Sequence, residues 1–474
     1  MTSITVGLEI SGINYIRRSF VPFNSINPAN GEILDSYPNW SDAEIESSLA
    51  KVSIGAKNWA NTRFEQRANY MRATAEVLRK NKSQLSQTIS LEMGKLLKEA
   101  EAEVEKSALG LEFYADHAEQ FLAPQMIKSD ASKSYVAYQP LGCVLAIMPW
   151  NFPLWQVFRF AAPALMAGNT AILKHASNVP QCALAIENCF IEAGLPEDIF
   201  RSFMITSSQV APLIADPRIH AVTITGSTPA GSSVASQAGK HLKKSVLELG
   251  GSDPFIVLND ADLDLAVKNA VASRYMNCGQ SCIAAKRFIV VNTIADQFLE
   301  KFTAAVEELT PGDPQNAETK LAPMARHDLR DELHTQVETA ISQGANVVTG
   351  CQPIEGPGAF YTPSIIDNID KYNLAYSDEL FGPVATVIRV QDDAEAVSVA
   401  NDTEFGLGGS IWTRDNTRGE QIALQLESGS AFVNGMVKSD PRLPFGGIKT
   451  SGYGRELSHE GIKEFVNTKT IWIR

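Results

Sequence analysis

The sequence has little cysteine and histidine, and neither residue occurs in a pattern that binds metal or builds a disulfide scaffold. Six cysteines and seven histidines are scattered through 474 residues, without His-x-x-x-His spacing or a Cys-His cluster. Zinc sites and small disulfide-rich secreted domains both need such clustering. We therefore expect no bound metal and a reduced, cytoplasmic protein.

The sequence also lacks the order of a secretory signal, an uninterrupted membrane span and an excess of positive charge. Residues 1–22 mix apolar and charged residues, whereas a signal peptide places a basic stretch before an apolar one. The most apolar region, 141–173, is broken by three prolines, an asparagine and an arginine, which indicates a buried crossing. The net charge of −13 gives no broad positive surface. We therefore expect neither nucleic acid nor a membrane as a partner.

What the sequence does contain is an alternation of short apolar runs with helix-like segments. The first runs span 144–147, 171–174, 221–224 and 255–258. Continuous apolar runs of this length are typical of parallel strands buried on both faces, so we expect them to form one open sheet. The pattern then resumes with strands at 287–291, 346–348 and 385–390 and helices at 295–309 and 329–344. The sequence therefore predicts two α/β units.

The region before these runs is predicted to be mainly helical. Residues 27–32 form a turn between two short strands, and helical periodicity follows from Ser41 to about residue 106. Ser41 and Glu44 have the spacing of a capping box. The recurring charged residues of this region are interpreted as solvated helix faces, and they are Arg67, Arg72, Lys95 and Glu101.

Two segments alternate polar and apolar residues, as exposed strands do. Residues 134–138 and the segment before them are predicted to form a protruding hairpin. Residues 465–472 have the same alternation near the C-terminus, and this strand could complete a sheet across a subunit boundary.

The Gly-x-Gly-x-x-Gly fingerprint of a dinucleotide-binding sheet is absent. The run at 221–225 is followed instead by Gly-Ser-Thr-Pro-Ala-Gly at 226–231, which leads into a helix. A glycine turn at a helix N-terminus can present free N–H groups to a phosphate. An ordinary strand–helix connection is the alternative.

Three polar side chains occupy positions that suit covalent catalysis. Cys282 follows a Gly-Gln turn, Glu248 ends an apolar run, and Asn151 lies in the rigid loop Pro-Trp-Asn-Phe-Pro at 149–153. A thiol nucleophile, a separate base and a preorganised amide are the parts of a covalent thiol mechanism. A small buried thiol and a capping asparagine are the structural alternatives for Cys282 and Asn151.

Taken together, six motifs in one order resemble the aldehyde dehydrogenase superfamily. They are residues 149–153, Gly-Ser-Thr at 226–228, Leu-Glu-Leu-Gly-Gly at 247–251, Gly-Gln-Ser-Cys at 279–282, Glu-Leu-Phe-Gly-Pro at 379–383 and Pro-Phe-Gly-Gly at 444–447. The resemblance covers nearly the whole chain. Within the superfamily, the residues around Trp155 and at 174–176 resemble bacterial succinate-semialdehyde dehydrogenases.

The resemblance implies an α/β fold with three parts. They are a Rossmann-like cofactor-binding domain at 1–121 and 142–251, a second α/β catalytic domain at 252–445, and a small β oligomerisation element at 122–141 and 456–474. Strand edges left unpaired in a monomer favour a homodimer or homotetramer.

The implied chemistry is NAD(P)-dependent oxidation of succinic semialdehyde to succinate. Cys282 would attack the aldehyde to form a thiohemiacetal, while the Asn151 amide and the Cys282 N–H hold the oxyanion. After hydride transfer, Glu248 would activate the water that hydrolyses the thioester. Cys278 stands where the family usually has a small residue, and a reversible disulfide with Cys282 is one hypothesis.

Three other functions remain open from the sequence. The first is oxidation of another aldehyde, such as glutaric semialdehyde or a neutral aliphatic one. The second is transfer of the acyl group to coenzyme A, which would not need the hydrolytic base Glu248. The third is a non-enzymatic protein of the same fold, which would be free to lose the nucleophile.

The resemblance also predicts the cofactor site. NAD-preferring members often carry a glutamate at the position of Ser177, and such a carboxylate would repel a 2′-phosphate. Ser177 removes that repulsion and Lys174 adds a cation, so we expect NADP to be preferred and NAD to be used less well. The other expected cofactor contacts are Trp150, Gly226, Ser227, Leu249, Glu379 and Phe381.

The expected substrate contacts are Trp155, Arg159 and Ser439. Asn151, Trp155 and Arg159 recur every four residues and can share one face. The Arg159 guanidinium could bind the distal carboxylate of a semialdehyde, with Ser439 as a hydroxyl donor. A salt bridge from Arg159 to a carboxylate of the protein is the alternative.

Overall fold

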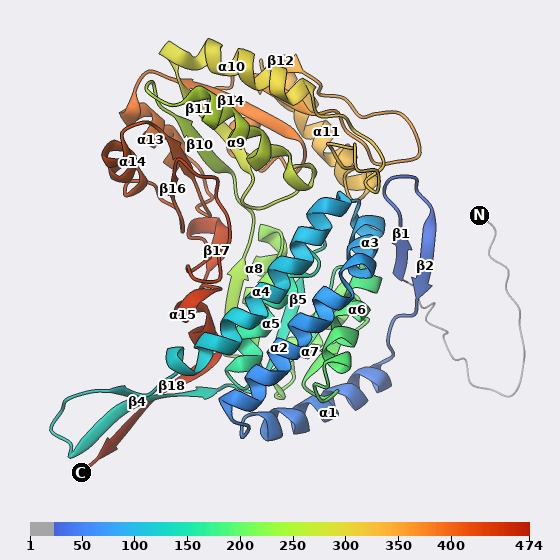
Figure 1. Cartoon of the computed structure of the whole chain (residues 1–474), viewed down its shortest axis with the longest axis vertical. Coiled ribbons are helices and arrows are strands. Elements are labelled where there is room, and N and C mark those ends of the chain that lie inside the picture. The colour runs from blue at the N-terminus through green and yellow to red at the C-terminus, as the bar shows by residue number, and fades with distance from the viewer. Residues whose placement is uncertain (1–22) are drawn as a thin grey trace, which may run out of the picture.

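The computed structural model describes residues 23–474, which form two α/β bodies and a protruding β element (Figure 1). Residues 1–22 lie outside the described residues. The prediction that they contain no secretory signal, and the start of the predicted segment 1–121, fall in this range. No helix among residues 23–474 is long and apolar enough to cross a membrane.

The described chain begins with a hairpin and four helices. They are β1 (Phe23–Ile26), β2 (Ile33–Tyr37), α1 (Asp42–Trp59), α2 (Phe64–Lys80), α3 (Lys82–Met93) and α4 (Leu97–Phe121). The capping box is confirmed, since the Ser41 side chain accepts from the Glu44 N–H and Glu44 accepts from the Ser41 N–H. The prediction of solvated faces is wrong for Arg67 and Lys95, which are 4% and 0% exposed.

The first sheet has the strand order β17-β9-β8-β5-β6-β7, with β5 to β9 parallel. Its strands are β5 (Cys143–Met148), β6 (Thr170–His175), β7 (Phe200–Ser202), β8 (Ile219–Thr225), β9 (Lys244–Glu248) and the antiparallel β17 (Gly452–Tyr453). The connecting helices are α5 (Trp155–Met166), α6 (Pro180–Glu192), α7 (Val210–Ala215) and α8 (Thr228–Lys240). The buried runs at 144–147, 171–174 and 221–224 therefore form neighbouring parallel strands, as predicted.

The second sheet has the order β12-β13-β14-β11-β10-β15-β16. Its strands are β10 (Asp253–Val257), β11 (Ala285–Val291), β12 (Asn346–Thr349), β13 (Ser364–Asp367), β14 (Val384–Val390), β15 (Ser410–Trp412) and β16 (Phe432–Val433). Its helices are α9 (Leu263–Tyr275), α10 (Asn292–Glu307), α11 (His327–Ser342), α12 (Leu374–Ser377), α13 (Asp393–Asn401) and α14 (Asn416–Ala423). The run at 255–258 was expected in the first sheet, and this is wrong because β10 pairs with β11 and β15.

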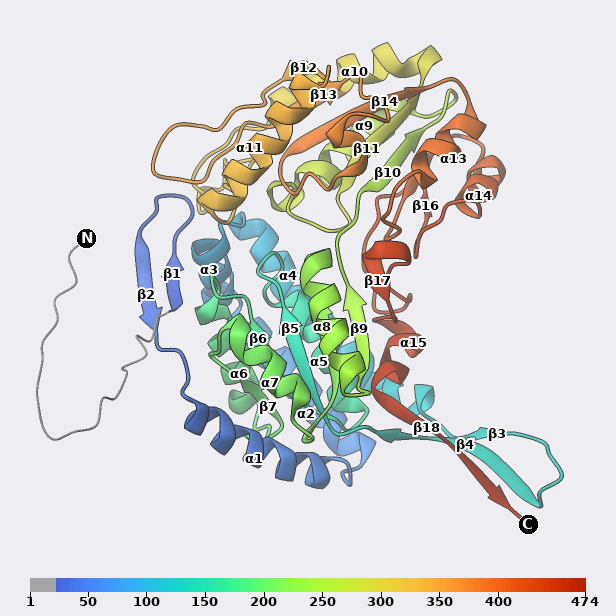
Figure 2. The ribbon, with the colours of Figure 1, turned by 180° about the vertical axis from the view of Figure 1, so that it is seen from behind.

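The third sheet protrudes from the first body, as Figures 1 and 2 both show. It contains β3 (Gln125–Met126), β4 (Lys133–Pro140) and β18 (Val466–Ile473), and α15 (Ser458–Ile462) precedes its last strand. β18 pairs antiparallel with β4 along eight residues, from Val466 opposite Pro140 to Ile473 opposite Lys133. The fold class of two α/β bodies and a small β element is confirmed, while the domain boundaries and the role of this sheet in assembly stay predictions.

The topology of the first sheet gathers several expected site residues at one edge. The loops after β5, β6, β8 and β9 all leave carboxyl ends of parallel strands. In open α/β sheets, ligands bind outside this edge. The sequence Pro-Trp-Asn-Phe-Pro, residues 174–177, the glycine turn at 226 and Glu248 are therefore brought to one side of the sheet.

Candidate active site

The loop that carries Cys282 has an unusual backbone. After α9, Asn277 and Cys278 both have φ of 54° and Gly279 has φ of 72°. A Cβ on Gly279 would lie 2.3 Å from the carbonyl oxygen of Gly382. Only glycine combines left-handed backbone with this close approach without strain, so the Gly-Gln turn of the sequence is a structural requirement for placing Cys282.

Two buried cations hold this loop through its carbonyl oxygens. Arg274 donates to the carbonyls of Gly279 at 3.0 Å, Ala285 at 3.2 Å and Leu380 at 3.1 Å. Lys286 donates to the carbonyls of Ser281 at 2.8 Å and Cys282 at 2.9 Å.

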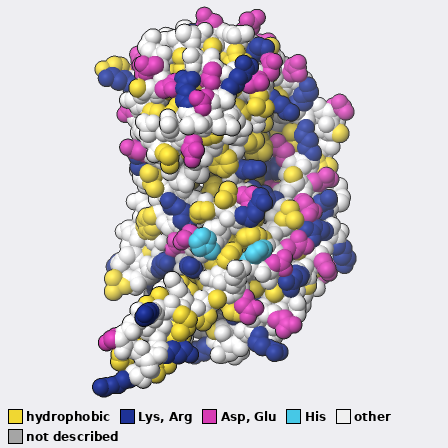
Figure 3. Space-filling view, turned by 60° about the vertical axis from the view of Figure 1, so that its left-hand side comes forward, with side chains coloured by type: hydrophobic (Ala, Val, Ile, Leu, Met, Phe, Trp, Pro, Cys, Tyr) yellow, Lys and Arg dark blue, Asp and Glu magenta, His cyan; other side chains and the backbone are white. Residues whose placement is uncertain are grey.

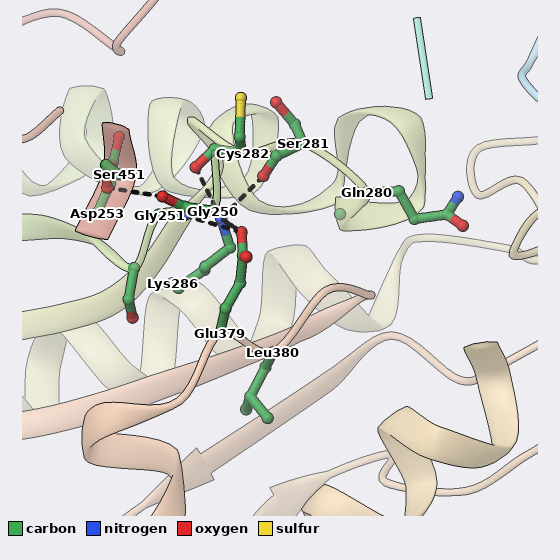
Figure 4. Close-up of polar contacts among 12 residues, drawn as sticks. Gly250, Gly251, Asp253, Gln280, Ser281, Cys282, Lys286, Glu379, Leu380 and Ser451 are labelled. Atoms are coloured by element: carbon green, nitrogen blue, oxygen red, sulfur yellow. Dashed lines mark hydrogen bonds and ion pairs between the residues drawn. The ribbon is translucent and has the colours of Figure 1, made fainter. Parts of the chain in front are cut away.

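Figure 4 shows the Lys286 ammonium among the nucleophile loop and Glu379, with which it forms an ion pair at 3.0 Å. Buried charges need such partners, and the Lys286 contacts join the Cys282 loop to the loop that carries Glu379 and Phe381.

Cys282 is partly exposed and lies where two cavities meet. Among the described residues it alone lines both of them. Burial of the site raises the pKa of its thiol to about 12, while the nearby cations Arg159 and Lys286 favour the thiolate. Within residues 23–474 no acceptor is found for the Cys282 backbone N–H, which leaves this group free to donate to a ligand.

The oxyanion candidate Asn151 is buried, and contacts from other elements hold its backbone carbonyl. That oxygen accepts from Lys95 Nζ at 2.9 Å and from Asn277 Nδ2 at 2.9 Å. The Asn151 amide donates to the carbonyl of Gln280 at 3.1 Å. A carboxamide has two N–H donors, so one remains for an oxyanion beside Cys282.

Lys95 is itself held by Glu103, with which it forms a buried ion pair. The other Glu103 oxygen accepts from the N–H groups of Leu154 at 2.8 Å and Trp155 at 3.0 Å, at the start of α5. A carboxylate is favourable at a helix N-terminus. Lys95 and Glu103 therefore fix both ends of the loop between Asn151 and α5.

Glu248 ends β9 and is 2% exposed, but it lines neither cavity. Its carboxyl lies against Gly446, where a Cβ would come within 2.6 Å of Oε1. No hydrogen-bond partner for either oxygen is found within residues 23–474. Burial, reinforced by the Glu456 carboxyl, raises the pKa of Glu248 well above its ordinary value. The structure therefore does not bring Glu248 to Cys282 in this conformation.

The first cavity, of about 300 Å³, contains most of the expected cofactor contacts. They are Trp150, Gly226, Ser227, Leu249, Glu379 and Phe381, and Asn151 also lines this space. Ser227 is at the N-cap position of α8 but its side chain makes no capping hydrogen bond, so the helix N-terminus presents free N–H groups to this side of the sheet. Trp150 and Phe381 meet edge to face with ring centroids 5.9 Å apart.

Lys174 and Ser177 lie outside this cavity, at the carboxyl end of β6 and in the loop that follows it. Lys174 is half-buried and Ser177 is exposed. Burial lowers the pKa of His175 to about 4, and its Nε2 lies 2.9 Å from the carbonyl oxygen of Pro153. His175 therefore supports the 149–153 loop from the neighbouring strand.

The second cavity, of about 200 Å³, contains the three expected substrate contacts, Trp155, Arg159 and Ser439. The Arg159 guanidinium forms an ion pair with Glu456, and both side chains are buried. The salt-bridge alternative for Arg159 is therefore what the structure shows, although the side chain still contributes to the cavity wall.

Sequence reasoning missed several residues of the site. Lys106 lines the second cavity, and Lys95 and Lys286 position the loops around Asn151 and Cys282. For Lys286 the signal was its place four residues after the nucleophile. Lys95 and Lys106 sit in a charged helical region and carry no local signal. Cys278 is 1% exposed and packs in the core of the second body, as a small buried thiol would.

Comparison with known proteins agrees with this arrangement. The model of the aldehyde dehydrogenase family matches residues 16–471. The chain is 49% identical to a probable succinate-semialdehyde dehydrogenase [NADP(+)] of Synechocystis, over 95% of this chain and 99% of that protein. It is also 49% identical to the succinate-semialdehyde dehydrogenase [NADP(+)] of Mycobacterium avium, over 96% of this chain and 97% of that one.

Among solved structures, the chain is similar to succinic semialdehyde dehydrogenase from Streptococcus pyogenes in complex with NADP+. The TM-score is 0.94 at 39% identity, and the match covers 95% of this chain and 99% of that one. A match of this extent includes both α/β bodies and the protruding sheet. The chain therefore belongs to the aldehyde dehydrogenase family.

Proposed function

We propose that this protein oxidises succinic semialdehyde to succinate, with NADP preferred and NAD used less well. The activity is that of relatives 49% identical over nearly the full length. The structural observation that carries the proposal is the position of Cys282 between two cavities, one with the expected cofactor contacts and one with the expected substrate contacts.

The residues of the first cavity fit a dinucleotide. Gly226 and Ser227 at the start of α8 suit its phosphates, and Glu379 and Phe381 suit the ribose next to the nicotinamide. Lys174 and Ser177, with no carboxylate at position 177, suit a 2′-phosphate. When bound, NADP supplies the hydride acceptor.

The chemistry of the chain begins at Cys282. Its thiolate attacks the aldehyde carbon to form a thiohemiacetal, and the Asn151 amide and the Cys282 N–H donate to the oxyanion. Loss of hydride from this carbon leaves a thioester on Cys282. Losing one oxyanion donor costs about 3 kcal/mol of transition-state stabilisation in comparable sites.

Hydrolysis of the thioester needs a base, and we assign this role to Glu248. Its side chain must first turn from Gly446 toward Cys282, since it lines neither cavity. There it takes a proton from water, whose oxygen attacks the thioester carbon. The products are succinate and the free Cys282 thiolate, and the proton taken from water is left on Glu248.

The substrate cavity supports an aldehyde with a distal carboxylate. Its wall combines apolar side chains such as Phe152 and Ile283 with basic side chains and the Ser439 hydroxyl. The wall also contains Glu99 and Glu103. A neutral aliphatic aldehyde would offer no carboxylate to the Arg159 guanidinium or the Ser439 hydroxyl. Glutaric semialdehyde, one methylene longer, is the competitor to exclude.

We also propose a cytoplasmic homodimer or homotetramer. β18 and β3 lie at the two edges of the protruding sheet, and an exposed strand edge can pair with another chain. Analytical ultracentrifugation of the full chain would test assembly, and a monomer would contradict it.

Acidic and basic side chains are interspersed on the face in Figure 3, with no single-sign surface of the kind that binds nucleic acid.

The decisive test is steady-state kinetics on an aldehyde panel with each cofactor. We expect kcat/KM to be highest for succinic semialdehyde with NADP, and lower for glutaric semialdehyde, butanal and every NAD reaction. A higher value for butanal would exclude the carboxylate substrate. Absence of oxidation of every aldehyde would favour the non-enzymatic alternative.

A further inference from the structure

Asn277 is buried where helix α4, the loop of Asn151 and the loop of Cys282 meet, and it has no role in the chemistry described above. Its side-chain Nδ2 donates to the carbonyl of Asn151 at 2.9 Å and to the carbonyl of Gln280 at 3.1 Å. Its backbone N–H donates to the carboxylate of Glu99, in the first turn of α4, whose two oxygens lie at 3.2 and 3.3 Å. One residue therefore joins three segments that are remote from one another in sequence.

The side-chain contacts of Asn277 form a closed ring with those of the Asn151 amide. The Gln280 carbonyl accepts from Nδ2 of both asparagines, each at 3.1 Å. A carbonyl oxygen has two acceptor sites, so the two amides occupy both. The Asn151 amide is thus attached to a carbonyl two residues before Cys282, and Asn277 holds the backbone carbonyl of the same Asn151. The ring fixes the direction of the remaining Asn151 N–H relative to the nucleophile.

The backbone of Asn277 is what aims its side chain at Asn151. Its φ of 54° is left-handed, a conformation that asparagine adopts more readily than most other non-glycine residues. Glu99 holds the N–H of this residue, and Gln280 Nε2 donates to its carbonyl at 3.1 Å. Both polar groups of the Asn277 backbone are therefore tied down while the side chain reaches across to the other loop.

Removing the Asn277 side chain would leave neither of its acceptors without a donor. The Asn151 carbonyl keeps Lys95 at 2.9 Å, and the Gln280 carbonyl keeps the Asn151 amide. Since buried groups left unpaired are what makes the loss of a hydrogen bond costly, we expect such a variant to fold. What it loses is the link that sets the position of the Asn151 amide.

We propose that Asn277 is a positioning residue, which aligns the Asn151 amide with Cys282 so that both can donate to the same oxyanion. The inference rests on the proposed function, because it takes Asn151 as an oxyanion donor. A donor stabilises the transition state only when it points to the place where the charge develops. Asn277 therefore acts on the rate of the step that forms the oxyanion and hardly on substrate binding.

The first test is the variant Asn277→Gly, which removes the amide and keeps a residue that accepts left-handed backbone. Rapid mixing with enzyme in excess, using whichever aldehyde of the panel reacts best, measures the first formation of reduced cofactor. We expect this rate to fall about tenfold or more, because a misplaced catalytic group loses much of its effect. KM for the aldehyde and for NADP should stay within about threefold of wild type.

Asn368→Gly is the matched control. Asn368 also has left-handed backbone, with φ of 62°, and its Nδ2 also donates to a backbone carbonyl, that of Gly344 at 3.2 Å. It is exposed and lines neither cavity. The same substitution at this place should leave the rate of the first turnover unchanged.

The second test asks whether Asn277 acts through Asn151. Residues that act as a unit have non-additive effects. In an Asn151→Ala background, Asn277→Gly should therefore lower the first-turnover rate by no more than about threefold. If Asn277→Gly does not fold, Glu99→Met replaces it in the same cycle, because it releases the Asn277 backbone from α4. Glu99→Gln, which keeps an oxygen acceptor for that N–H, should then restore most of the rate.

Two outcomes would overturn the inference. One is a wild-type first-turnover rate in Asn277→Gly, and the other is an equal loss with and without the Asn151 amide, which would mean that Asn277 acts independently of it. Wild-type protein that oxidises no aldehyde would instead refute the proposed function. Active wild-type enzyme with additive variants would refute only the role of Asn277.

Discussion

The Lys286 ammonium lies 3.0 Å from a carboxylate oxygen of Glu379 and also donates to the carbonyl of Cys282 at 2.9 Å. The same Glu379 carboxylate accepts from the N–H of Gly251 at 3.2 Å. One cation therefore fixes the expected ribose contact and the nucleophile peptide relative to each other (Figure 4).

Replacing Lys286 with Met should weaken both cofactor binding and turnover. The Glu379 carboxylate and two carbonyl oxygens would lose their donor in a site where unpaired polar groups are costly. We expect kcat to fall about tenfold and KM for NADP to rise, by a similar factor, in steady-state assays with saturating aldehyde.

Lys268→Met is the matched control, because Lys268 is exposed on α9. It should have wild-type kinetics. If Lys286→Met lowers the melting temperature but leaves kcat and KM for NADP unchanged at a temperature where it is folded, then Lys286 acts only on stability.

Burst kinetics can separate the step that needs Cys282 from the step that needs Glu248. Glu248→Gln should retain a rapid burst of reduced cofactor and lose turnover, because hydride leaves before the thioester is hydrolysed. Cys282→Ala should lose both, because no thiohemiacetal forms. Rapid-mixing absorbance of the reduced cofactor measures the two phases.

A missing burst in Glu248→Gln would place the carboxylate before hydride transfer, as a base for the Cys282 thiol. The raised pKa of that thiol, about 12, makes this the alternative to exclude. Asn151→Ala serves as the comparison, since it removes an oxyanion donor and should lower the burst rate without removing the base.

The sequence predicted the features that depend on local pattern or on burial of both strand faces. The Ser41–Glu44 capping box needs only neighbouring residues, and the short continuous apolar runs at 144–147 and 221–224 are typical of buried parallel strands. Sheet membership was harder. β9 and β10 are separated by only four residues, and hydrophobicity alone does not tell that the chain crosses to a second sheet between them.

The site residues that the sequence did not predict were missed for a different reason. Lys95 and Lys106 look like solvated helix charges because each contacts a loop that is remote in sequence, the Asn151 carbonyl 56 positions from Lys95 and Ser439 333 positions from Lys106. The burial of Arg159 beside Glu456 has the same origin. A single sequence gives the charge of such residues, but only the fold supplies the partner that decides between a structural and a binding role.

Cofactor preference should respond to one position on the loop after β6. Ser177→Glu places a carboxylate where the 2′-phosphate is expected, so like-charge repulsion should lower kcat/KM for NADP about tenfold, the exposed position limiting the effect. The value for NAD should stay the same or rise. The ratio of kcat/KM for the two cofactors is the measurement.

Ser177→Gln is nearly isosteric with this variant but neutral, and it should retain more of the NADP preference. If both variants reduce NADP activity equally, then side-chain size and not charge controls the site. If neither changes the ratio, residue 177 lies away from the ribose.

His175 gives the protein a pH-dependent stability that acts through the loop carrying Asn151. The neutral ring satisfies both nitrogens, since Nδ1 accepts from the Ala176 N–H at 2.9 Å and Nε2 lies 2.9 Å from the carbonyl oxygen of Pro153. Its pKa is lowered from 6.5 to about 4 by burial, so the unfolded chain binds this proton more readily. The contribution of the neutral His175 ring to the free energy of unfolding is therefore fully present above about pH 6.5 and is lost as the pH falls toward 4. The total loss is up to about 3 kcal/mol. Urea unfolding across this range should show a shallower decline for His175→Gln, and an unchanged slope would mean that His175 is not the group that titrates.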